Sequence, residues 1–260
     1  MSVREVLQRV VRRLDRALER SEAAIWTGIY ERYEDVPVEG QGFTDPSWRE
    51  TLASELRAVR GGRWYEEFAA EHDVLMLLCR LSSSNPLHIV DFGGGFGASF
   101  FFLQQGLSGR AIRYQVIETA EVSAAGTEET THPALTFATS VGPEHRGADV
   151  IFVKSALQYL PDYKATLTSL LRLDASHVVL EKFAGVESRT YATSQVNHSG
   201  SRIAFWFISL QEVLEMAKAS GYRCILRRKL MRTYAQEGFP EHMRMRQATT
   251  LVFERDTSRR

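Results

Sequence analysis

A glycine-rich turn between an apolar strand and an apolar helix is the feature of this sequence with the clearest chemical potential. Residues 89–103 read IVDFGGGFGASFFFL. Gly93 and Gly95 have no Cβ atom, so the backbone can adopt positive φ angles and a ligand can approach closely. The helix that follows directs free N–H groups and the positive end of its dipole toward the turn. Asp91, two residues before the first glycine, would repel a pyrophosphate but could accept hydrogen bonds from an amine.

The same turn also fits a dinucleotide-binding pattern. Gly93, Gly95 and Ala98 satisfy the G-x-G-x-x-G/A spacing that holds a pyrophosphate. The next predicted strand ends in Glu118, and an acid there can accept hydrogen bonds from the ribose of a nicotinamide cofactor or of S-adenosylmethionine (SAM). The acid at the end of the first strand, together with Gly97 at the start of the helix, favours SAM.

Composition restricts the class of protein. The 260 residues are 44% hydrophobic and 25% charged, which suits one sizeable α/β domain with an appendage. The 32 basic residues balance 32 acidic ones, and no stripe of arginines and aromatic residues is present, so we expect no nucleic-acid partner. Cys79 and Cys224 lie in apolar stretches without a metal-ligand spacing. They are therefore predicted to be buried thiols, and no metal is expected.

Two features bear on the compartment. No apolar run reaches the roughly eighteen residues needed to span a bilayer, and the first residues lack the apolar segment of a signal peptide, so we expect a cytoplasmic protein. Residues 3–18 carry apolar side chains at helical spacing, with arginines between them. A basic amphipathic helix could contact anionic lipid through residues 1–20; the alternative is a helix that covers the domain or a partner subunit.

From residue 87 onward, short β-rich runs alternate with helical patterns. This alternation predicts an α/β fold with a seven-stranded, doubly wound, Rossmann-like sheet. The predicted strands are 87–92, 112–118, 135–138, 149–154, 177–183, 222–230 and 249–254. The predicted helices are 98–105, 120–128, 163–173 and 210–219, with Ser209 as a candidate cap of the last one.

The remaining segments suggest two additions to this sheet. Before residue 87, two or three helices flank a loop at 35–48, so residues 1–86 are predicted to form an N-terminal helical cap and residues 87–260 the sheet domain. The stretch 184–208 is too long for an ordinary connection between a strand and a helix. Because it follows a strand at the ligand-binding edge, it is predicted to be a lid insertion.

These elements resemble the class I SAM-dependent methyltransferases. The string VDFGGGFG at 90–97 corresponds to their cofactor motif, Glu118 to their acidic ribose ligand, and ADVIFVKSALQYLPDY at 148–163 to their fourth strand. More narrowly, WTGIY at 26–30, SALQYLPD at 155–162, QV at 195–196 and FWFIS at 205–209 resemble a bacterial family of methyltransferases often encoded among surface-polysaccharide genes. The resemblance runs from about Trp26 to the last strand.

This resemblance implies a set of cofactor contacts. Asp91 and the glycines would line the methionine part of SAM, Glu118 the ribose, and Ser155 the region of the sulfonium. Many relatives place Asp or Asn after the third strand to bind adenine, whereas this chain has Ala138, Thr139 and Ser140, which leaves Ser140 or a backbone group for that contact. The predicted cofactor-binding residues are Asp91, Gly93, Gly94, Gly95, Gly97, Glu118, Ser140 and Ser155.

The predicted catalytic residues are His198, Tyr159 and Gln158. Methyl transfer chiefly requires alignment of the acceptor and exclusion of water, but a hydroxyl acceptor also benefits from a general base. His198, in the lid segment, is the candidate base; the alternative is a solvent-exposed histidine in a turn. Gln158 and Tyr159 follow the fourth strand, where they could position an acceptor, or Tyr159 could simply pack on the next helix.

Other polar and aromatic residues allow weaker expectations. Trp26, Tyr30, Phe205 and Trp206 could form an aromatic wall against a sugar ring or lipid carrier, or belong to the core. Glu181 and Lys182 end a predicted strand, where they could bind the acceptor or, as we expect, form a local ion pair. His132 and His145 lie in polar loops and are expected to be solvated.

Taken together, the residues and the resemblance predict a SAM-dependent, O-directed methyltransferase. Its acceptor would be a small molecule or a saccharide, such as a nucleotide-sugar intermediate of a surface glycan. Two alternatives stay open: a nicotinamide-dependent oxidoreductase that uses the glycine spacing, and a non-catalytic SAM-binding protein that docks through residues 1–20.

Overall fold

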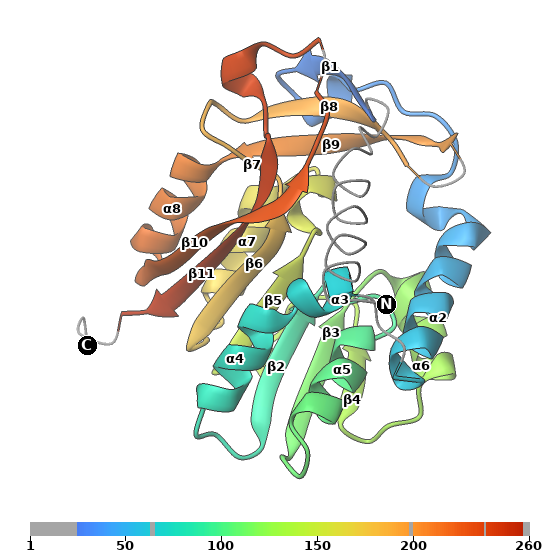
Figure 1. The fold of residues 1–260 in the computed structure, drawn as a ribbon, viewed down its shortest axis with the longest axis vertical. Coiled ribbons are helices and arrows are strands. Elements are labelled where there is room, and N and C mark those ends of the chain that lie inside the picture. The colour runs from blue at the N-terminus through green and yellow to red at the C-terminus, as the bar shows by residue number, and fades with distance from the viewer. Residues whose placement is uncertain (1–24, 63–65, 198–199, 237, 257–260) are drawn as a thin grey trace, which may run out of the picture.

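In the computed structural model, the described residues are 25–62, 66–197, 200–236 and 238–256. They form a seven-stranded sheet with helices on both faces and a smaller second sheet (Figure 1). In spatial order, the main sheet consists of β10 (Tyr222–Thr233), β11 (Gln247–Arg255), β6 (His177–Phe183), β5 (Val150–Lys154), β2 (Leu87–Phe92), β3 (Ile112–Ile117) and β4 (Leu135–Ala138).

The predicted sheet is confirmed, and its topology is specific. Strands β2 to β6 are parallel to one another, whereas β11 is antiparallel to both β6 and β10. Side chains alternate between the faces, so Ile89 packs with one layer of helices and Val90 with the other. The first layer contains α2 (Pro46–Arg60), α4 (Asp73–Leu81) and α5 (Ala98–Gly106), and the second contains α7 (Tyr163–Leu171) and α8 (Leu210–Ala219).

Shorter elements complete the chain. Helix α6 (Ala120–Glu129) packs on β4, and α3 (Glu66–Ala70) precedes α4. Helix α2 begins at a proline and is capped by Asp45, whose side chain accepts a hydrogen bond from the Ser47 N–H at 2.9 Å. Five 3₁₀ turns lie among the described residues: η1 (Tyr33–Asp35), η2 (Gly42–Thr44), η3 (Pro143–His145), η4 (Leu157–Tyr159) and η6 (Glu241–Met243).

A second sheet of four strands lies over the carboxyl ends of the parallel strands (Figure 1). Its order is β1 (Trp26–Tyr30), β8 (Tyr191–Val196), β9 (Arg202–Ser209) and β7 (Gly185–Val186). Three of these strands come from the segment predicted as a lid, and β1 comes from the segment predicted as a helical cap. The cap is therefore not wholly helical, because residues 26–30 pair with β8.

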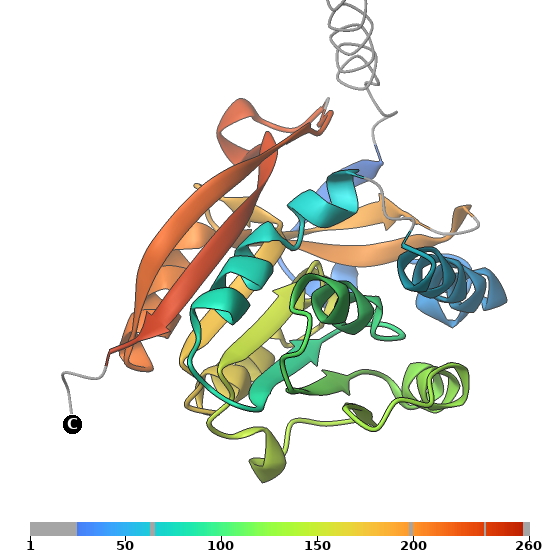
Figure 2. The ribbon, with the colours of Figure 1, turned by 60° about the horizontal axis from the view of Figure 1, so that its bottom comes forward.

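The strands β10 and β11 continue past the main sheet toward this second sheet (Figure 2). The Tyr234 ring, just after β10, lies 5.4 Å from the Trp26 ring. The Tyr191 hydroxyl donates a hydrogen bond to the backbone oxygen of Met243 at 2.7 Å. These contacts join the two sheets through the connection between β10 and β11.

Two local expectations are wrong. Cys224 is exposed on the edge strand β10, whereas Cys79 is buried as predicted. His145 is buried, because it folds back onto its own loop and its Nδ1 accepts a hydrogen bond from the Gly142 N–H at 2.9 Å. Ser209 is the N-cap residue of α8, as predicted, although its side chain makes no capping hydrogen bond; its backbone N–H donates to Thr190 Oγ1 at 2.9 Å.

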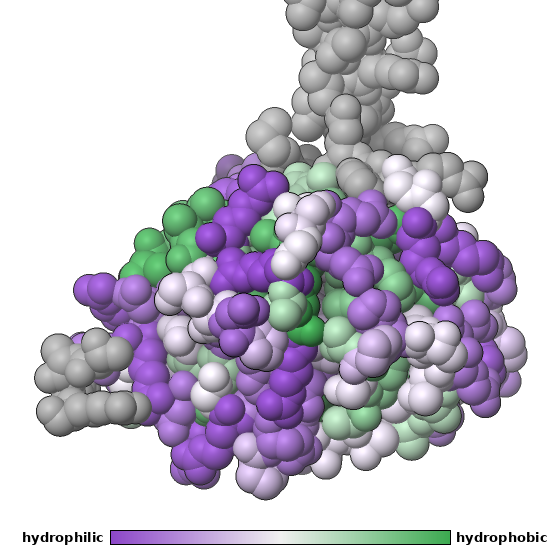
Figure 3. All heavy atoms as spheres, turned by 90° about the horizontal axis from the view of Figure 1, so that it is seen from below, coloured by the Kyte–Doolittle hydropathy of each residue, from purple (hydrophilic) through white to green (hydrophobic). Residues whose placement is uncertain are grey.

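The surface carries mixed polarity. Figure 3 shows a face of mainly hydrophilic side chains, with hydrophobic ones gathered on the side where Figures 1 and 2 place β10 and β11. The exposed large apolar residues of β10 are Ile225 and Leu226. Within the described ranges, no helix has both the length and the apolar character needed to cross a membrane.

Candidate functional site

The glycine turn lies at the carboxyl end of β2, immediately before α5. Gly93 and Gly95 have φ angles of +75° and +57°, in the left-handed region that other residues rarely adopt. A Cβ at Gly93 would lie 2.6 Å from the Cβ of Ala156, and one at Gly95 would lie 2.7 Å from Leu52 Cδ2. Both positions therefore require glycine for backbone conformation and for space.

The other two predicted glycines have different roles in the same turn. A Cβ at Gly94 would overlap the carboxyl group of Asp91, so its absence leaves room for that acid. Gly97 is the N-cap residue of α5 with a φ of +76°, and its N–H donates to the Gly94 oxygen at 3.0 Å. The turn thus closes tightly over the end of β2.

Asp91 lies beneath this turn and is 1% exposed. The Tyr114 hydroxyl donates a hydrogen bond to Asp91 Oδ2 at 2.6 Å. Burial raises the pKa of Asp91 to about 7, although the Tyr114 hydrogen bond and the positive charge of Lys154 offset part of the effect. A cationic group placed beside such a carboxyl group would favour its ionised form.

Glu118 follows β3 on the other side of the turn. The Gly95 N–H donates to its Oε1 at 3.1 Å, and the Thr119 N–H donates to its Oε2 at 3.0 Å. Burial raises the pKa of Glu118, and these two backbone hydrogen bonds partly offset the rise. Each carboxylate oxygen keeps acceptor capacity, so this side chain could accept hydrogen bonds from ligand hydroxyls as well.

Ser155, Gln158 and Tyr159 lie together after β5. Ser155 has a φ of +53°, and its N–H donates to the Glu181 oxygen at 3.0 Å. Gln158 is buried, and its Nε2 donates to Ser155 Oγ at 2.8 Å. Burial raises the pKa of the Tyr159 phenol to about 12, and hydrogen bonds with Gln195 and Ser155 offset part of this rise. These residues therefore form one polar network at the carboxyl edge.

A charge cluster that the sequence reasoning missed lies beside Asp91. Lys182 Nζ donates to Glu71 Oε1 at 2.7 Å, and Lys154 Nζ lies 3.4 Å from Glu71 Oε2. Burial alone would raise the pKa of Glu71, but the charges of Lys154 and Lys182 outweigh it and lower that pKa. A signal for the two lysines was present in the sequence, because each lies at the end of an apolar strand. No feature of the sequence indicated that Glu71 would lie beside them.

The predicted ion pair of Glu181 with Lys182 is wrong. Consecutive residues of a strand point to opposite faces, so the two side chains find different partners. Lys182 binds Glu71, whereas Glu181 Oε1 accepts a hydrogen bond from Thr250 Oγ1 at 2.9 Å. Burial raises the pKa of Glu181 to about 7.

For the aromatic residues, the structure supports the core alternative rather than a single aromatic wall. Trp26 and Phe205 do lie together, with ring centroids 5.7 Å apart. Trp206 points to the opposite face of β9, where its Nε1 donates to the Leu160 oxygen at 3.1 Å and its ring packs on Tyr33. Strand alternation divides the aromatic residues between two faces, and most of them are buried.

The remaining predicted site residues are Ser140 and His198. Ser140 is exposed after β4. His198 lies outside the described residues, so its role as a base stays a prediction.

His132, expected to be solvated, is half-buried, and its Nδ1 accepts a hydrogen bond from the Ala134 N–H at 3.2 Å. Among the described residues, no group of three or more His, Cys, Asp or Glu side chains is arranged to hold a metal.

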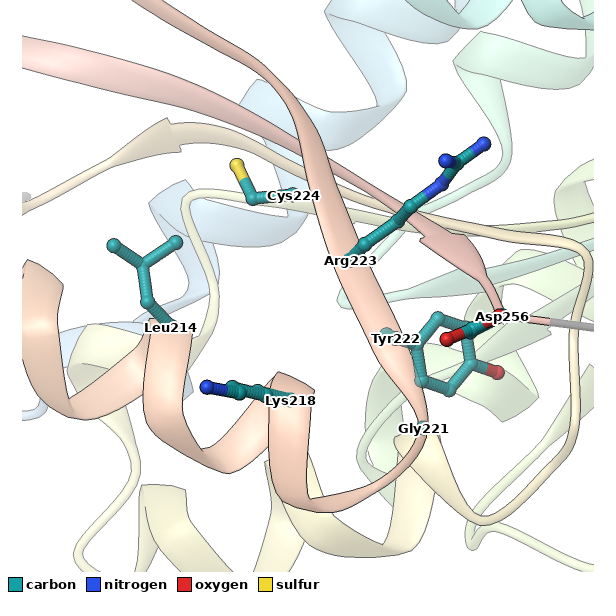
Figure 4. Close-up of a pocket in the computed structure, with 7 residues that line it drawn as sticks. All are labelled: Leu214, Lys218, Gly221, Tyr222, Arg223, Cys224 and Asp256. Atoms are coloured by element: carbon teal, nitrogen blue, oxygen red, sulfur yellow. The ribbon is translucent and has the colours of Figure 1, made fainter. Parts of the chain in front are cut away.

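A separate hollow of about 340 Å³ lies between α8 and the start of β10 (Figure 4). It is lined by Leu214, Lys218, Gly221, Tyr222, Arg223, Cys224 and Asp256. Strand β10 starts at the amino edge of the parallel sheet, so this hollow lies at the edge opposite to Asp91 and Glu118. It is therefore distinct from the candidate site.

Comparison with known proteins identifies the fold. No protein-family model and no curated protein sequence matches this chain. A chain from the Haloferax volcanii complex of the Trm112 methyltransferase activator with a protein described as a methyltransferase is 17% identical, with a TM-score of 0.51 over 80% of this chain and 97% of that one. A Listeria monocytogenes structure described as a SAM-dependent methyltransferase is 13% identical, with a TM-score of 0.50 over 72% of this chain and 99% of that one. The chain thus has the Rossmann-like fold of class I SAM-dependent methyltransferases, as the sequence predicted.

Proposed function

We propose that this protein is a SAM-dependent methyltransferase that methylates a hydroxyl oxygen of a saccharide or nucleotide-sugar acceptor in the cytoplasm. The observation that carries the proposal is the placement of two acids around one glycine turn. Asp91 is buried below the turn, and Glu118 accepts a hydrogen bond from it on the other side. Parallel α/β sheets bind ligands at this carboxyl edge.

The residues fit SAM because the cofactor carries an ammonium group and a ribose. Asp91 would accept hydrogen bonds from the ammonium group, and the positive charge of that group would in turn favour the ionised form of this buried acid. Glu118 would accept hydrogen bonds from the ribose hydroxyls. The same pocket is unsuited to a pyrophosphate, since a buried carboxylate beside the glycine turn would repel it.

When bound, SAM supplies a methyl group on a positively charged sulfur: the acceptor oxygen bonds to that carbon, the carbon–sulfur electron pair stays on sulfur, and the acceptor proton is released. The protein's own residues would align the acceptor and exclude water. Ser155, Gln158 and Tyr159 support this role because they form a polar network next to the glycine turn. His198 is the proposed recipient of the proton.

The acceptor class is inferred from four short strings and from the position of the second sheet. The strings at 26–30, 155–162, 195–196 and 205–209 resemble a family often encoded among surface-polysaccharide genes. The second sheet, which contains three of these strings in full or in part, lies over the carboxyl edge. A saccharide acceptor suits this arrangement because aromatic and amide side chains occur on the same strands.

The two alternatives predict different ligands. A nicotinamide-dependent oxidoreductase would use the glycine spacing for a pyrophosphate, but the antiparallel β11 separates β6 from β10, unlike the usual dinucleotide-binding order. A non-catalytic docking protein would bind SAM without turnover and bind lipid through residues 1–20, which lie outside the described residues.

Calorimetry with S-adenosylhomocysteine and NAD, titrated separately into the full chain, tests the donor. We expect S-adenosylhomocysteine to bind and NAD not to bind. Glu118→Ala tests the contact with the cofactor, and Glu129→Ala is its control. Both variants lose one negative charge, but Glu129 is an exposed acid at the end of α6, away from the glycine turn. Binding of NAD alone would overturn the proposal, and cofactor binding without methylation of any glycan or nucleotide-sugar pool would favour the docking protein.

A further inference from the structure

Two buried polar side chains of the second sheet have unused hydrogen-bonding atoms. Trp26 is 3% exposed and Gln195 is 7% exposed. Within the described part of the chain, neither Trp26 Nε1 nor Gln195 Oε1 has a hydrogen-bond partner. A buried polar group without a hydrogen-bond partner destabilises the fold, so an unsatisfied donor and an unsatisfied acceptor in one sheet require an explanation.

The two residues are neighbours. Trp26 of β1 stands directly opposite Gln195 of β8 in the antiparallel register. Directly opposed residues project to the same face with their Cβ atoms about 5 Å apart. The unsatisfied indole N–H and the unsatisfied amide oxygen therefore belong to neighbouring side chains on one face of the sheet, yet neither satisfies the other.

This pair is connected to the proposed cofactor site. The Tyr159 ring packs on Phe205, a ring neighbour of Trp26, at 5.2 Å, and interactions with the Gln195 and Ser155 side chains lower the pKa of its phenol. Gln158 also binds Ser155, through Nε2 at 2.8 Å, while its own buried Oε1 has no partner in the described chain. The network thus runs from the end of β5 to the second sheet.

The backbone is strained at the same edge. Ser155 and Lys182 have φ angles of +53° and +51°, which residues other than glycine rarely adopt. Ser155 immediately follows β5, and Lys182 is the residue before the last in β6. These two strands are adjacent, and Lys154 of β5 pairs with Glu181 of β6. Strain of this kind concentrates at ligand sites, where the surrounding structure holds it in place.

We propose that Trp26 and Gln195 bind one hydroxyl group of the methyl acceptor. The indole N–H would donate to the hydroxyl oxygen, and Gln195 Oε1 would accept the hydroxyl hydrogen. A hydroxyl group both accepts and donates, so it satisfies both orphaned atoms at once, whereas a carboxylate or phosphate could not donate to Gln195. This inference rests on the proposed function, because it assigns the acceptor of that same reaction.

The surroundings of the pair favour a hydroxylated ring. The Phe205 ring lies 5.7 Å from Trp26 and 5.2 Å from Tyr159, so aromatic surface is available for the C–H face of the acceptor. The Tyr234 ring packs edge-on against Trp26, with the ring centroids 5.4 Å apart. Because Trp26 is 3% exposed, the acceptor would reach its indole N–H only after a neighbouring side chain has moved.

The test follows the indole N–H signal of Trp26 by NMR, in the full chain saturated with S-adenosylhomocysteine. Trp26→Phe assigns the signal among the four tryptophans. The probes are a panel of methyl glycosides and uridine-diphosphate sugars, with benzoate as a ring that carries a carboxylate and no hydroxyl. We expect at least one hydroxylated ring to shift the Trp26 signal, and Gln195→Met to weaken that binding at least tenfold.

A matched control lies one residue away. Ser194 is on the opposite face of β8, where its Oγ donates to the Pro37 oxygen at 3.0 Å, so Ser194→Ala should leave probe binding unchanged. No shift of the Trp26 signal by any hydroxylated probe, or a shift by benzoate alone, would overturn the inference while S-adenosylhomocysteine still binds. Failure of S-adenosylhomocysteine to bind the wild-type chain would instead overturn the proposed function.

Discussion

The substitution Asp91→Asn tests the site in two ways, because it should stabilise the free protein and weaken cofactor binding. Burial raises the pKa of Asp91 to about 7 from an ordinary 3.8. In the unfolded chain this carboxyl group ionises near 3.8, whereas the folded protein retains the proton until about pH 7. Between these values the unfolded state binds fewer protons, so the contribution of Asp91 to the free energy of unfolding falls as pH rises.

The size of this effect follows from the two pKa values. At about 1.4 kcal/mol per pKa unit, ionising Asp91 in the folded protein costs roughly 4 kcal/mol more than in the unfolded chain. The loss develops between about pH 4 and pH 7 and is constant above that range. Asp91→Asn keeps the shape and an acceptor for the Tyr114 hydroxyl but removes the charge. The variant should therefore gain up to about 4 kcal/mol relative to wild type between pH 4 and pH 8.

Urea unfolding of both proteins across pH 4 to 8 measures this difference. The pKa of Glu181 is also raised to about 7, so Glu181 contributes its own pH dependence to stability in both proteins. The difference in free energy of unfolding between wild type and variant at each pH removes this shared contribution. Glu129→Gln, an exposed acid on α6, controls for loss of charge alone. Stability profiles for wild type and Asp91→Asn that stay parallel from pH 4 to 8 would refute the reasoning about burial.

Cofactor affinity should change in the opposite direction. Only the ionised carboxyl group attracts an ammonium group, so wild type should bind S-adenosylhomocysteine about tenfold more weakly at pH 6 than at pH 8. Asp91→Asn should bind at least tenfold more weakly at pH 8, about 1.4 kcal/mol, and should lose most of this pH dependence. Calorimetry at the two pH values measures both effects, and unchanged affinity in the variant would remove Asp91 from the cofactor site.

Three further substitutions test other parts of the site. Glu118→Ala should weaken S-adenosylhomocysteine binding at least tenfold, about 1.4 kcal/mol, by calorimetry; unchanged affinity would exclude the ribose contact. Gly95→Ala should lower stability by more than about 1 kcal/mol in urea unfolding, because the residue has positive φ and its new Cβ would press on Leu52, and a neutral result would contradict the described turn. Trp26→Phe should lower stability by less than about 2 kcal/mol in urea unfolding, because removal of an unsatisfied buried N–H offsets part of the cost of the cavity that the smaller ring leaves; a larger loss would contradict an unsatisfied indole nitrogen.

The main sheet could be predicted because its signals are local. Each of its seven predicted strands is present, and the helix 210–219 was placed with the right bounds. Buried parallel strands are nearly continuous apolar runs, and glycine or polar residues separate them from the helices. Asp91 and Glu118 could be placed at the edge of the sheet for the same reason, since each ends such a run.

The second sheet could not be predicted in the same way. The strand Trp26–Tyr30 precedes its partner β8 by about 160 residues, and its five residues show no alternation that distinguishes a strand from a helix start. The segment 184–208 was singled out by its length and by its place after a strand, but neither feature predicted the strands within it. Its strands gain their stability from pairing with one another and with β1, which is a tertiary effect.

Residue types and their order along the chain determined the doubly wound sheet, the glycine turn and the two acids beside it, because strand periodicity and turn chemistry act over a few neighbouring residues. Tertiary structure alone decided that Lys182 pairs with Glu71, 111 residues away, rather than with Glu181. It also decided that Trp26 meets Gln195. Such pairings depend on which distant strands become neighbours, and burial then sets the cost of every polar atom left without a partner.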